Sequence, residues 1–230
     1  MIRKEKKAVI EMFRRFGALI VDLCLVIFLT VMIALPLRGV SGYAAASEKM
    51  DAIFNSIAAE HGVDINITNQ QYNALSEEEK LAVDAALKDI SENDEAAELY
   101  SKTVKLTMII TFSSLFVAVV ILDLVLPLIF KNGQTIGKKL MRLEVRRRDG
   151  APVNFVTLLL RSISGKFFLD YGLPVFFFFS MLYANAGRTP LVGIMLLATA
   201  QIVSIAVTSD RRALHDLLAG TYVYAERLNF

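Results

Sequence analysis

The sequence predicts an all-α membrane protein: a four-transmembrane-helix bundle with a small extracytoplasmic helical insert and a short cytoplasmic β-hairpin followed by an amphipathic helix. Three observations lead to this prediction. The chain of 230 residues is 55% hydrophobic, with a mean hydropathy of +0.50, whereas soluble domains are about 45–50% apolar. The excess is collected in four runs long enough to cross a bilayer. Basic and acidic residues are segregated between the segments that join these runs.

The first apolar run covers residues 16–37 and follows a basic N-terminal segment. At 1.5 Å per residue, a helix of this length crosses about 30 Å of hydrocarbon. The run exceeds the about 7–15 apolar residues of a cleaved signal peptide, so we interpret it as a membrane span, although three alanines follow at residues 44–46. It contains Cys24, the one cysteine of the chain, which excludes an internal disulfide and a zinc site built on cysteines.

The second run, residues 104–130, is interrupted by Asp123 and Pro127. Proline removes a helical hydrogen-bond donor, so we expect Pro127 to kink or end this helix near its inner end. The helix that precedes Tyr100 is expected to run directly into this span.

The third run covers residues 167–184 and includes four consecutive phenylalanines, and the fourth covers residues 190–207. Pro190 suits the first turn of a helix. Only residues 185–189 connect the two runs, and so short a connection predicts an antiparallel helical hairpin.

Lysine and arginine predict the orientation, because basic flanking loops stay in the cytoplasm. Residues 1–15 carry six of the 25, the loop 131–166 carries nine and the tail 210–230 carries three. Both chain ends are therefore expected in the cytoplasm, with the protein in the cell membrane. The prediction divides the chain into residues 1–37 with the first span, the insert 38–103, and residues 104–230 with the other spans, the basic loop and the tail.

The insert holds 13 of the 23 acidic residues. A helix is expected near residues 46–60, followed by a loop through residues 62–73. Ser76 and Glu79 then form a capping box, and the apolar residues after it recur at helical spacing. These are Leu81, Ala82, Ala85, Ala86, Leu87 and Ile90. The insert is either a solvated helical cap or a vestibule whose acidic charge concentrates cations.

The sequence of the basic loop, residues 131–166, predicts that it is ordered. Residues 143–146 and 153–156 flank the turn dipeptide Asp149-Gly150, which favours a β-hairpin. Residues 156–166 favour an amphipathic helix at the membrane surface. The segment 133–138 has the wrong glycine spacing for a phosphate-binding loop, so we interpret it as a tight turn into a short helix.

Six basic side chains of this loop form a predicted patch that binds anionic lipid of the cytoplasmic leaflet. They are Lys138, Lys139, Arg142, Arg146, Arg147 and Arg148. We do not expect nucleic-acid binding, because the orientation of the chain already explains where these charges lie.

Three carboxylates fall within spans, where a charged group costs several kcal/mol and is a candidate for function. Asp22 lies seven residues after Arg15, Asp123 eight residues before Lys131, and Asp170 nine residues after Arg161. At 1.5 Å per residue these separations are about 10–14 Å, so the three acids lie at a similar depth and are expected to converge. Each also has a structural interpretation. Asp170 forms an i,i+4 pair with Lys166, Asp22 pairs with an arginine of another segment, and Asp123 is protonated or paired across helices.

The tail contains a second i,i+4 pair, Arg212 with Asp216, and His215, which titrates near neutral pH. A His-Asp dipeptide without a nucleophile does not make a catalytic triad. We expect a short interfacial helix here whose charges dock against the basic loop.

At three segments the chain resembles the RDD family of membrane proteins, named for one arginine and two aspartates. These are residues 15–22 (RFGALIVD), 133–140 (GQTIGKKL) and 212–221 (RALHDLLAGT). The resemblance covers everything but the insert and implies that Arg15, Asp22 and Asp216 are the named residues. Transport is proposed for the family, and some members resemble sodium/proton antiporters, whereas others are fused to unrelated domains, which suits a binding or scaffold role.

The predicted function is transport of monovalent cations (Na⁺) or protons (H⁺). Asp22 and Asp123 hold the ion, Arg15 tunes Asp22, and Asp216 gates or braces the inner mouth. Four spans without an internal repeat are few for alternating access, so a homo-oligomer is expected. The alternative is a non-transporting membrane scaffold or a subunit that binds a partner or lipid. We do not expect an enzyme, a cofactor or a metal site, because the sequence has no nucleophile–base pairing and no nucleotide loop.

Overall fold

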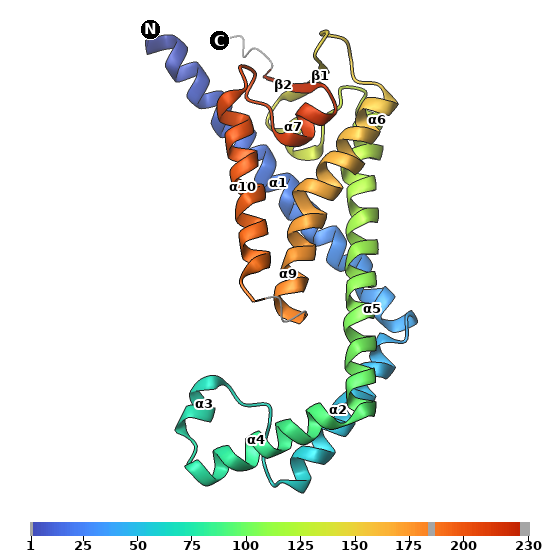
Figure 1. Cartoon of the computed structure of the whole chain (residues 1–230). Coiled ribbons are helices and arrows are strands. Elements are labelled where there is room, and N and C mark those ends of the chain that lie inside the picture. The colour runs from blue at the N-terminus through green and yellow to red at the C-terminus, as the bar shows by residue number, and fades with distance from the viewer. Residues whose placement is uncertain (1, 184–186, 226–230) are drawn as a thin grey trace. The chain divides into compact units, whose positions relative to one another are not determined.

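A computed structural model describes residues 2–183 and 187–225, with side chains described from residue 10 onward. The chain divides into two compact units. The first, here the membrane unit, comprises residues 1–34 and 111–230, and the second, the insert unit, comprises residues 35–110. Helices α1 (Ile2–Val40) and α5 (Asp94–Val119) contribute residues to both units (Figure 1).

Four helices are long and apolar enough to span a membrane, which confirms the predicted fold class. Their bounds are Ile10–Val40, Asp94–Phe130, Phe155–Tyr183 and Thr189–Val207. The second continues from α5 through the π-helical segment η1 (Val120–Val125) into α6 (Leu126–Phe130), and the third is α8 (Phe155–Leu159), the π-helical segment η2 (Leu160–Gly172) and α9 (Leu173–Tyr183). The fourth is α10 (Thr189–Val207).

Two details of the predicted spans change. Residues 156–166 are no separate surface helix, because α8 and η2 continue without a break into α9. Pro127 does not itself end the helix, which continues as α6 to Phe130, three residues later; the irregular, π-helical segment η1 lies directly before α6. Helices α9 and α10 pack together as the predicted hairpin, although residues 184–186 of the third run and its connection lie outside the described residues.

The core of the membrane unit joins three spans. Val26, Leu115 and Val119 are buried and contact side chains of the third span, including Phe167 and Tyr171. The Phe116 and Phe167 rings meet edge to face with centroids 5.2 Å apart. Large apolar side chains cover the outer faces of the same helices, as expected where lipid is the solvent.

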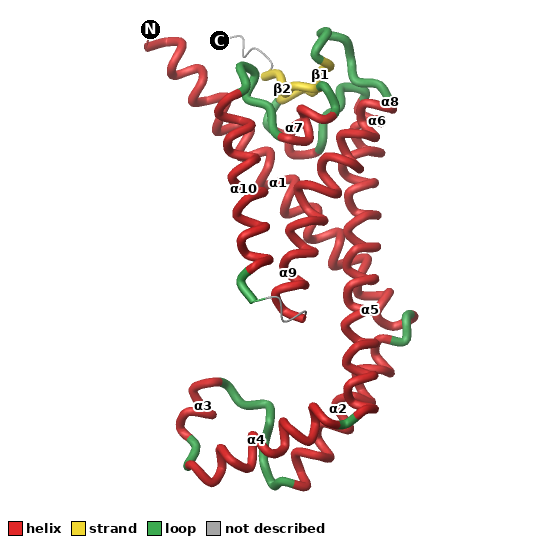
Figure 2. The backbone as a smooth tube through the Cα atoms, in the orientation of Figure 1, coloured by secondary structure: helices red, strands yellow, loops and turns green. Residues whose placement is uncertain are grey.

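Short elements lie together at one end of the membrane unit, where α1 begins (Figures 1 and 2). They are α7 (Ile136–Leu140), α11 (Leu214–Leu218) and the strands β1 (Leu143–Arg147) and β2 (Thr221–Ala225), which we call the end cap. The turn before α7 is the predicted one: Gly133 has φ +64°, and the Thr135 side chain accepts a hydrogen bond from the Lys138 N–H.

The strand pairing differs from the predicted hairpin. β1 pairs antiparallel with β2, from Leu143 opposite Ala225 to Arg147 opposite Thr221. The expected partner, residues 153–156, makes no strand; one bridge joins Arg146 to Pro152. Proline has no N–H to continue a ladder, and Asn154 caps α8 by accepting a hydrogen bond from Thr157 N–H. The third span therefore begins where the second strand was expected.

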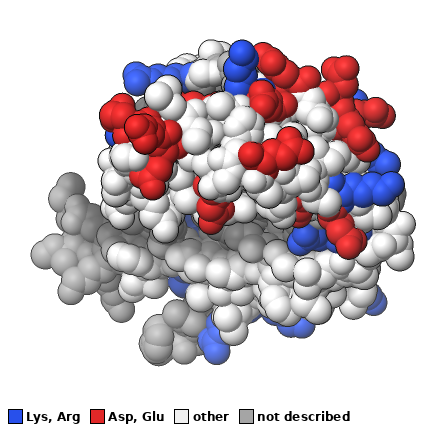
Figure 3. Space-filling model, turned by 90° about the horizontal axis from the view of Figure 1, so that it is seen from below, with Lys and Arg blue, Asp and Glu red and all other residues white. Residues whose placement is uncertain are grey.

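The insert unit is helical and acidic. It contains α2 (Tyr43–Glu60), α3 (Asn69–Ala74) and α4 (Glu77–Glu92), and the predicted capping box of Ser76 and Glu79 is present. The buried face of α4 is rotated from the predicted stripe: Val83 and Ala86 are buried, whereas Leu81 and Leu87 are exposed. The small side chains of α2 at this contact, such as Ala58, set which face packs. Separate groups of acidic side chains, with some basic ones between them, lie on the face that Figure 3 shows.

Gly165 lets the end cap approach the third span. A Cβ atom at this position would lie 2.5 Å from the His215 Cβ and 2.9 Å from its Cα. Such a distance is far below ordinary van der Waals contact, so α11 packs here only against glycine.

We predict that Gly165→Ala destabilises the protein by about 1–3 kcal/mol, because the new methyl group displaces α11. The measurement is the thermal midpoint of the purified protein in detergent. Gly39→Ala is the matched control: Gly39 is also helical, and nothing lies within 4 Å of the Cβ it would gain. Equal midpoints for both variants would contradict the close packing of α11.

Candidate functional site

The two π-helical segments carry three of the six buried charged residues in the described part of the chain, together with the half-buried Asp170. Asp123 lies in η1, and Arg161, Lys166 and Asp170 lie in η2. Pro127 has no N–H for the Asp123 carbonyl four residues earlier, and the Ser162 hydroxyl donates to this oxygen instead, at 2.5 Å. π-Helical turns occur frequently at functional sites.

Asp123 forms an ion pair with Lys166 of the third span, and both side chains are nearly inaccessible, at 2% and 6% exposure. Of the two alternatives predicted for Asp123, the structure therefore shows the pair across helices. The predicted pair of Lys166 with Asp170 is wrong. Asp170 is less buried and has other partners, whereas Asp123 depends on Lys166 to compensate its charge in an apolar environment.

Asp22 of α1 holds the start of α7. Its carboxylate accepts hydrogen bonds from the Thr135 hydroxyl at 2.5 Å and the Gly137 N–H at 2.8 Å. Its cation is Lys138, with Nζ 3.7 Å from Oδ2, and not the predicted arginine. A Cβ at Gly137 would collide with the Ala18 carbonyl and lie 2.8 Å from Asp22 Oδ1. Glycine therefore lets α7 reach the carboxylate.

Lys138 was predicted to belong to an exposed basic patch. It is instead buried beside Asp22. Burial, together with the positive charges of Lys166 and Arg161, lowers the pKa of Lys138 to about 7. Asp22 and Asp123 act in the opposite direction but do not restore the ordinary value.

The other five side chains of the predicted patch differ among themselves. Arg146 and Arg147 form ion pairs with Glu144 and Asp149, at 3.0 and 2.6 Å. Lys139, Arg142 and Arg148 are exposed. The six basic residues that are close in the sequence therefore do not form one continuous basic surface.

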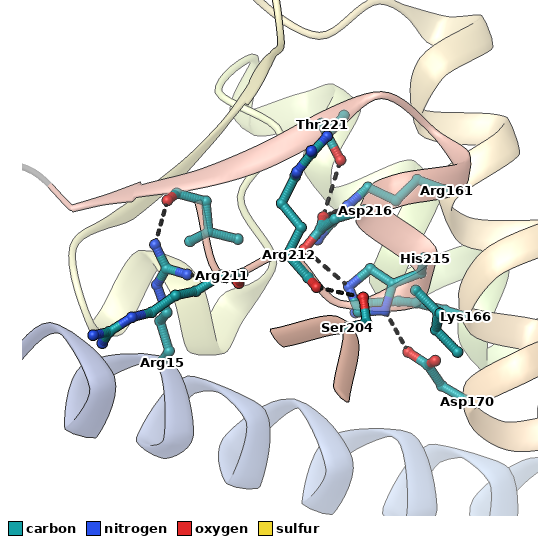
Figure 4. Close-up of polar contacts among 12 residues, drawn as sticks. Arg15, Arg161, Lys166, Asp170, Ser204, Arg211, Arg212, His215, Asp216 and Thr221 are labelled. Atoms are coloured by element: carbon teal, nitrogen blue, oxygen red, sulfur yellow. Dashed lines mark hydrogen bonds and ion pairs between the residues drawn. The ribbon is translucent and has the colours of Figure 1, made fainter. Parts of the chain in front are cut away.

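Asp216 of α11 is the most fully bonded acid. It accepts from Arg161 Nε at 2.9 Å and from the Thr221 hydroxyl at 2.9 Å, and Arg161 Nη2 lies 2.8 Å away (Figure 4). Burial raises the pKa of Asp216, but the positive charge of Arg161 outweighs it and holds this pKa well below its usual range. The predicted pair with Arg212 is wrong, because Arg212 faces Asp210. The tail helix docks through Asp216 on Arg161, which lies in the third span and not in the loop as predicted.

His215 lies between two carboxylates, with Nδ1 2.6 Å from Asp170 and Nε2 3.5 Å from Asp216. Each ring nitrogen of His215 thus faces a different carboxylate. Gln201 of α10 completes this contact: its amide donates to Asp170 at 2.5 Å and accepts from the Leu214 N–H at 3.1 Å. Sequence reasoning missed Gln201, although an amide in an apolar run is a detectable signal.

Arg15 does not contact Asp22, so its predicted tuning role is wrong. Its guanidinium donates to main-chain carbonyls of the tail, at 2.7 Å for Val223, 3.0 Å for Arg211 and 3.4 Å for Asp210 (Figure 4). The neighbouring Arg14 donates to the carbonyls of Met141 and Arg142. The first span therefore holds both the loop and the tail.

These contacts join the predicted acids into one network. Lys138 and Lys166 each interact electrostatically with both Asp22 and Asp123. Asp170 is farther along, connected through His215 to Asp216 and Arg161. The network holds the carboxylates of Asp22, Asp123, Asp170 and Asp216. Its basic side chains are Lys138, Lys166 and Arg161, and His215 lies between two of the acids.

We predict that Asp216→Asn costs about 3–5 kcal/mol of unfolding free energy, because Arg161 is then buried without a counter-charge. Replacing both partners, as Arg161→Met with Asp216→Leu, should cost less than Asp216→Asn alone. Chemical unfolding in detergent measures both. Asp149→Asn, which removes an exposed partner of Arg147, is the control and should change the free energy by less than about 1 kcal/mol. A loss for the double variant as large as for Asp216→Asn would contradict the pairing.

We further predict that stability rises with pH between about 7 and about 10.5, because the unfolded chain binds a proton at Lys138 that the folded chain releases. Lys138→Gln should remove this contribution, while Lys139→Gln, at the exposed neighbour, should retain it. Thermal midpoints of the three proteins at pH 7 and about 9.5 give the comparison. Parallel pH profiles for the native protein and Lys138→Gln would refute it.

Comparison with known proteins agrees with the sequence resemblance. The RDD family model matches residues 9–220. Uncharacterized protein YckC of Bacillus subtilis (strain 168) is 32% identical over 112 residues, which are 48% of this chain and 60% of that protein. The chain thus spans less than two thirds of the length of that relative, and no solved structure matches the chain. From the family match over nearly all of its length, the chain belongs to the RDD family of membrane proteins.

Proposed function

We propose that this protein exchanges a monovalent cation for a proton across the membrane, with Asp22 as the cation-binding carboxylate and Lys138 as the group that gives up the proton. The observation that carries the proposal is the position of Lys138, buried 3.7 Å from Asp22 with its pKa lowered to about 7. A buried acid needs a counter-charge. Near neutral pH Lys138 can lose its proton and with it the positive charge that compensates Asp22.

The exchange balances in charge. Protonated Lys138 and ionised Asp22 form the resting pair. A monovalent cation that binds Asp22 replaces the ammonium, and Lys138 then releases its proton and becomes neutral. The Thr135 hydroxyl, 2.5 Å from the carboxylate, offers a second oxygen to the incoming cation. Each cation is therefore exchanged for one proton.

The remaining residues of the network have supporting roles in this proposal. Lys166 helps to lower the pKa of Lys138, while its partner Asp123 acts in the opposite direction. Asp216 and Arg15 brace the end cap. We propose that this end faces the cytoplasm of the cell, and that the protein works as a homo-oligomer because it has four spans.

A second candidate is a membrane scaffold or partner-binding subunit that transports nothing. It is favoured by the pairing of Asp22, Asp123 and Asp216 with basic side chains, which also suits a purely structural network. The exposed acidic side chains of the insert would then bind the partner (Figure 3). A pull-down that recovers no stoichiometric partner would weigh against it.

Reconstituted vesicles with a pH-sensitive dye inside distinguish the two candidates. An imposed Na⁺ or K⁺ gradient should move protons through the native protein. Asp22→Asn should abolish this flux, and Lys138→Gln should uncouple it, because no proton is released when the cation binds. Lys105→Gln, at an exposed lysine of α5, is the matched control and should transport normally. Native fluxes equal to those of empty vesicles would end the transport proposal, and a flux that survives Asp22→Asn would remove this residue from it.

A further inference from the structure

Two exposed lysines lie beside the inner end of the second span. Lys131 directly follows Phe130, the last residue of α6, and adopts a left-handed conformation with φ +63°. Lys139 of α7 places its ammonium 3.8 Å from the centroid of the Phe130 ring. No carboxylate pairs with either side chain among the ion pairs of the described residues. Both positive charges are thus available at one point where a span ends.

The apolar side chains around these lysines are also exposed. Ile136 lies three residues before Lys139 and four before Leu140, so it neighbours both on the surface of α7. Ile136 and Leu140 are 36% and 67% exposed. Ile129, two residues before Lys131, is 63% exposed. A helix in water would bury this face. Apolar side chains next to unpaired lysines at the end of a span match the two parts of an anionic phospholipid, its acyl chains and its phosphate.

A cleft of about 220 Å³ adjoins Lys131 and offers space for the polar part of such a molecule. Asn132 and Arg146 also line it. Glu144, the one acid in the lining, is engaged by Arg146 at 3.0 Å. The cleft therefore presents donors to an anion.

We propose that Lys131, Lys139 and the exposed face of α7 form a binding site for one anionic phospholipid of the bilayer. The phosphate lies by the two ammonium groups, the headgroup extends toward the cleft, and an acyl chain lies along Ile136 and Leu140. Of the six residues of the predicted basic patch, only Lys139 belongs to the charged centre of this site. It does not depend on transport.

The test uses the absence of tryptophan from this chain. Leu140→Trp in the otherwise native protein supplies a single fluorophore at the site. The protein is reconstituted in phosphatidylcholine vesicles with a minor share of phosphatidylglycerol, and bromine is carried on the acyl chains of one lipid or the other. Bromine quenches tryptophan on contact, so the two preparations report which lipid lies there.

Quenching by brominated phosphatidylglycerol should correspond to an enrichment of at least about fivefold over its bulk share, because each nearby lysine favours an anionic lipid. Lys131→Gln with Lys139→Gln should reduce the enrichment to the bulk value. Met195→Trp, on the exposed face of α10, is the control and should show no preference. Ile136→Trp repeats the measurement if Leu140→Trp does not fold.

Three results would overturn the proposal. One is equal quenching by the two lipids at Leu140→Trp and Ile136→Trp. Another is an enrichment that persists without the two lysines, which would assign it to other basic groups. The third is an enrichment lost to inorganic phosphate but not to chloride at equal ionic strength, which would make free phosphate the occupant.

Discussion

The ion pair between Arg161 and Asp216 is the contact on which the end cap depends. Arg161 belongs to the third span and is 2% exposed, and Asp216 belongs to the tail. Neither charge is tolerable alone in this environment, so the tail must fold back onto the bundle for the span to keep its arginine. The Thr221 hydroxyl bonds the same carboxylate and thereby sets where β2 begins. The pairing of β2 with β1 then follows from the position of Asp216.

Close approach of backbones makes this network possible. Because Gly137 has no side chain, α7 can contact the carboxylate of Asp22, and because Gly165 has none, α11 can pack against η2. The π-helical segments carry Asp123 and Lys166, which pair with each other across two spans, and Arg161, which pairs with Asp216 of the tail. The lost helical bond at Pro127 is replaced by Ser162, which belongs to a different span. Irregular helix geometry and buried charge therefore occur in the same residues.

The spans were predictable from the sequence because their signal is local: each is a continuous apolar run with basic residues on one flank. Which acid pairs with which basic side chain in the network was not predictable. Asp170 and Asp123 both face possible cations, and the choice of Lys166 depends on how the second and third spans are turned toward each other. Likewise Lys138 and Lys139 are adjacent in the sequence, yet one is buried beside Asp22 and the other exposed. Strand β2 was missed because its partner lies about 75 residues earlier, and pairing at that separation leaves no local pattern.

Arg15 connects the beginning of this chain to its end. Its guanidinium donates to the carbonyls of Asp210, Arg211 and Val223, which lie 195 to 208 residues later in the sequence. All three acceptors belong to the main chain, so a substitution of these tail side chains leaves the acceptor atoms in place. A shift of the tail backbone along its path would remove them. Arg15 therefore fixes the route of the tail independently of which side chains the tail carries.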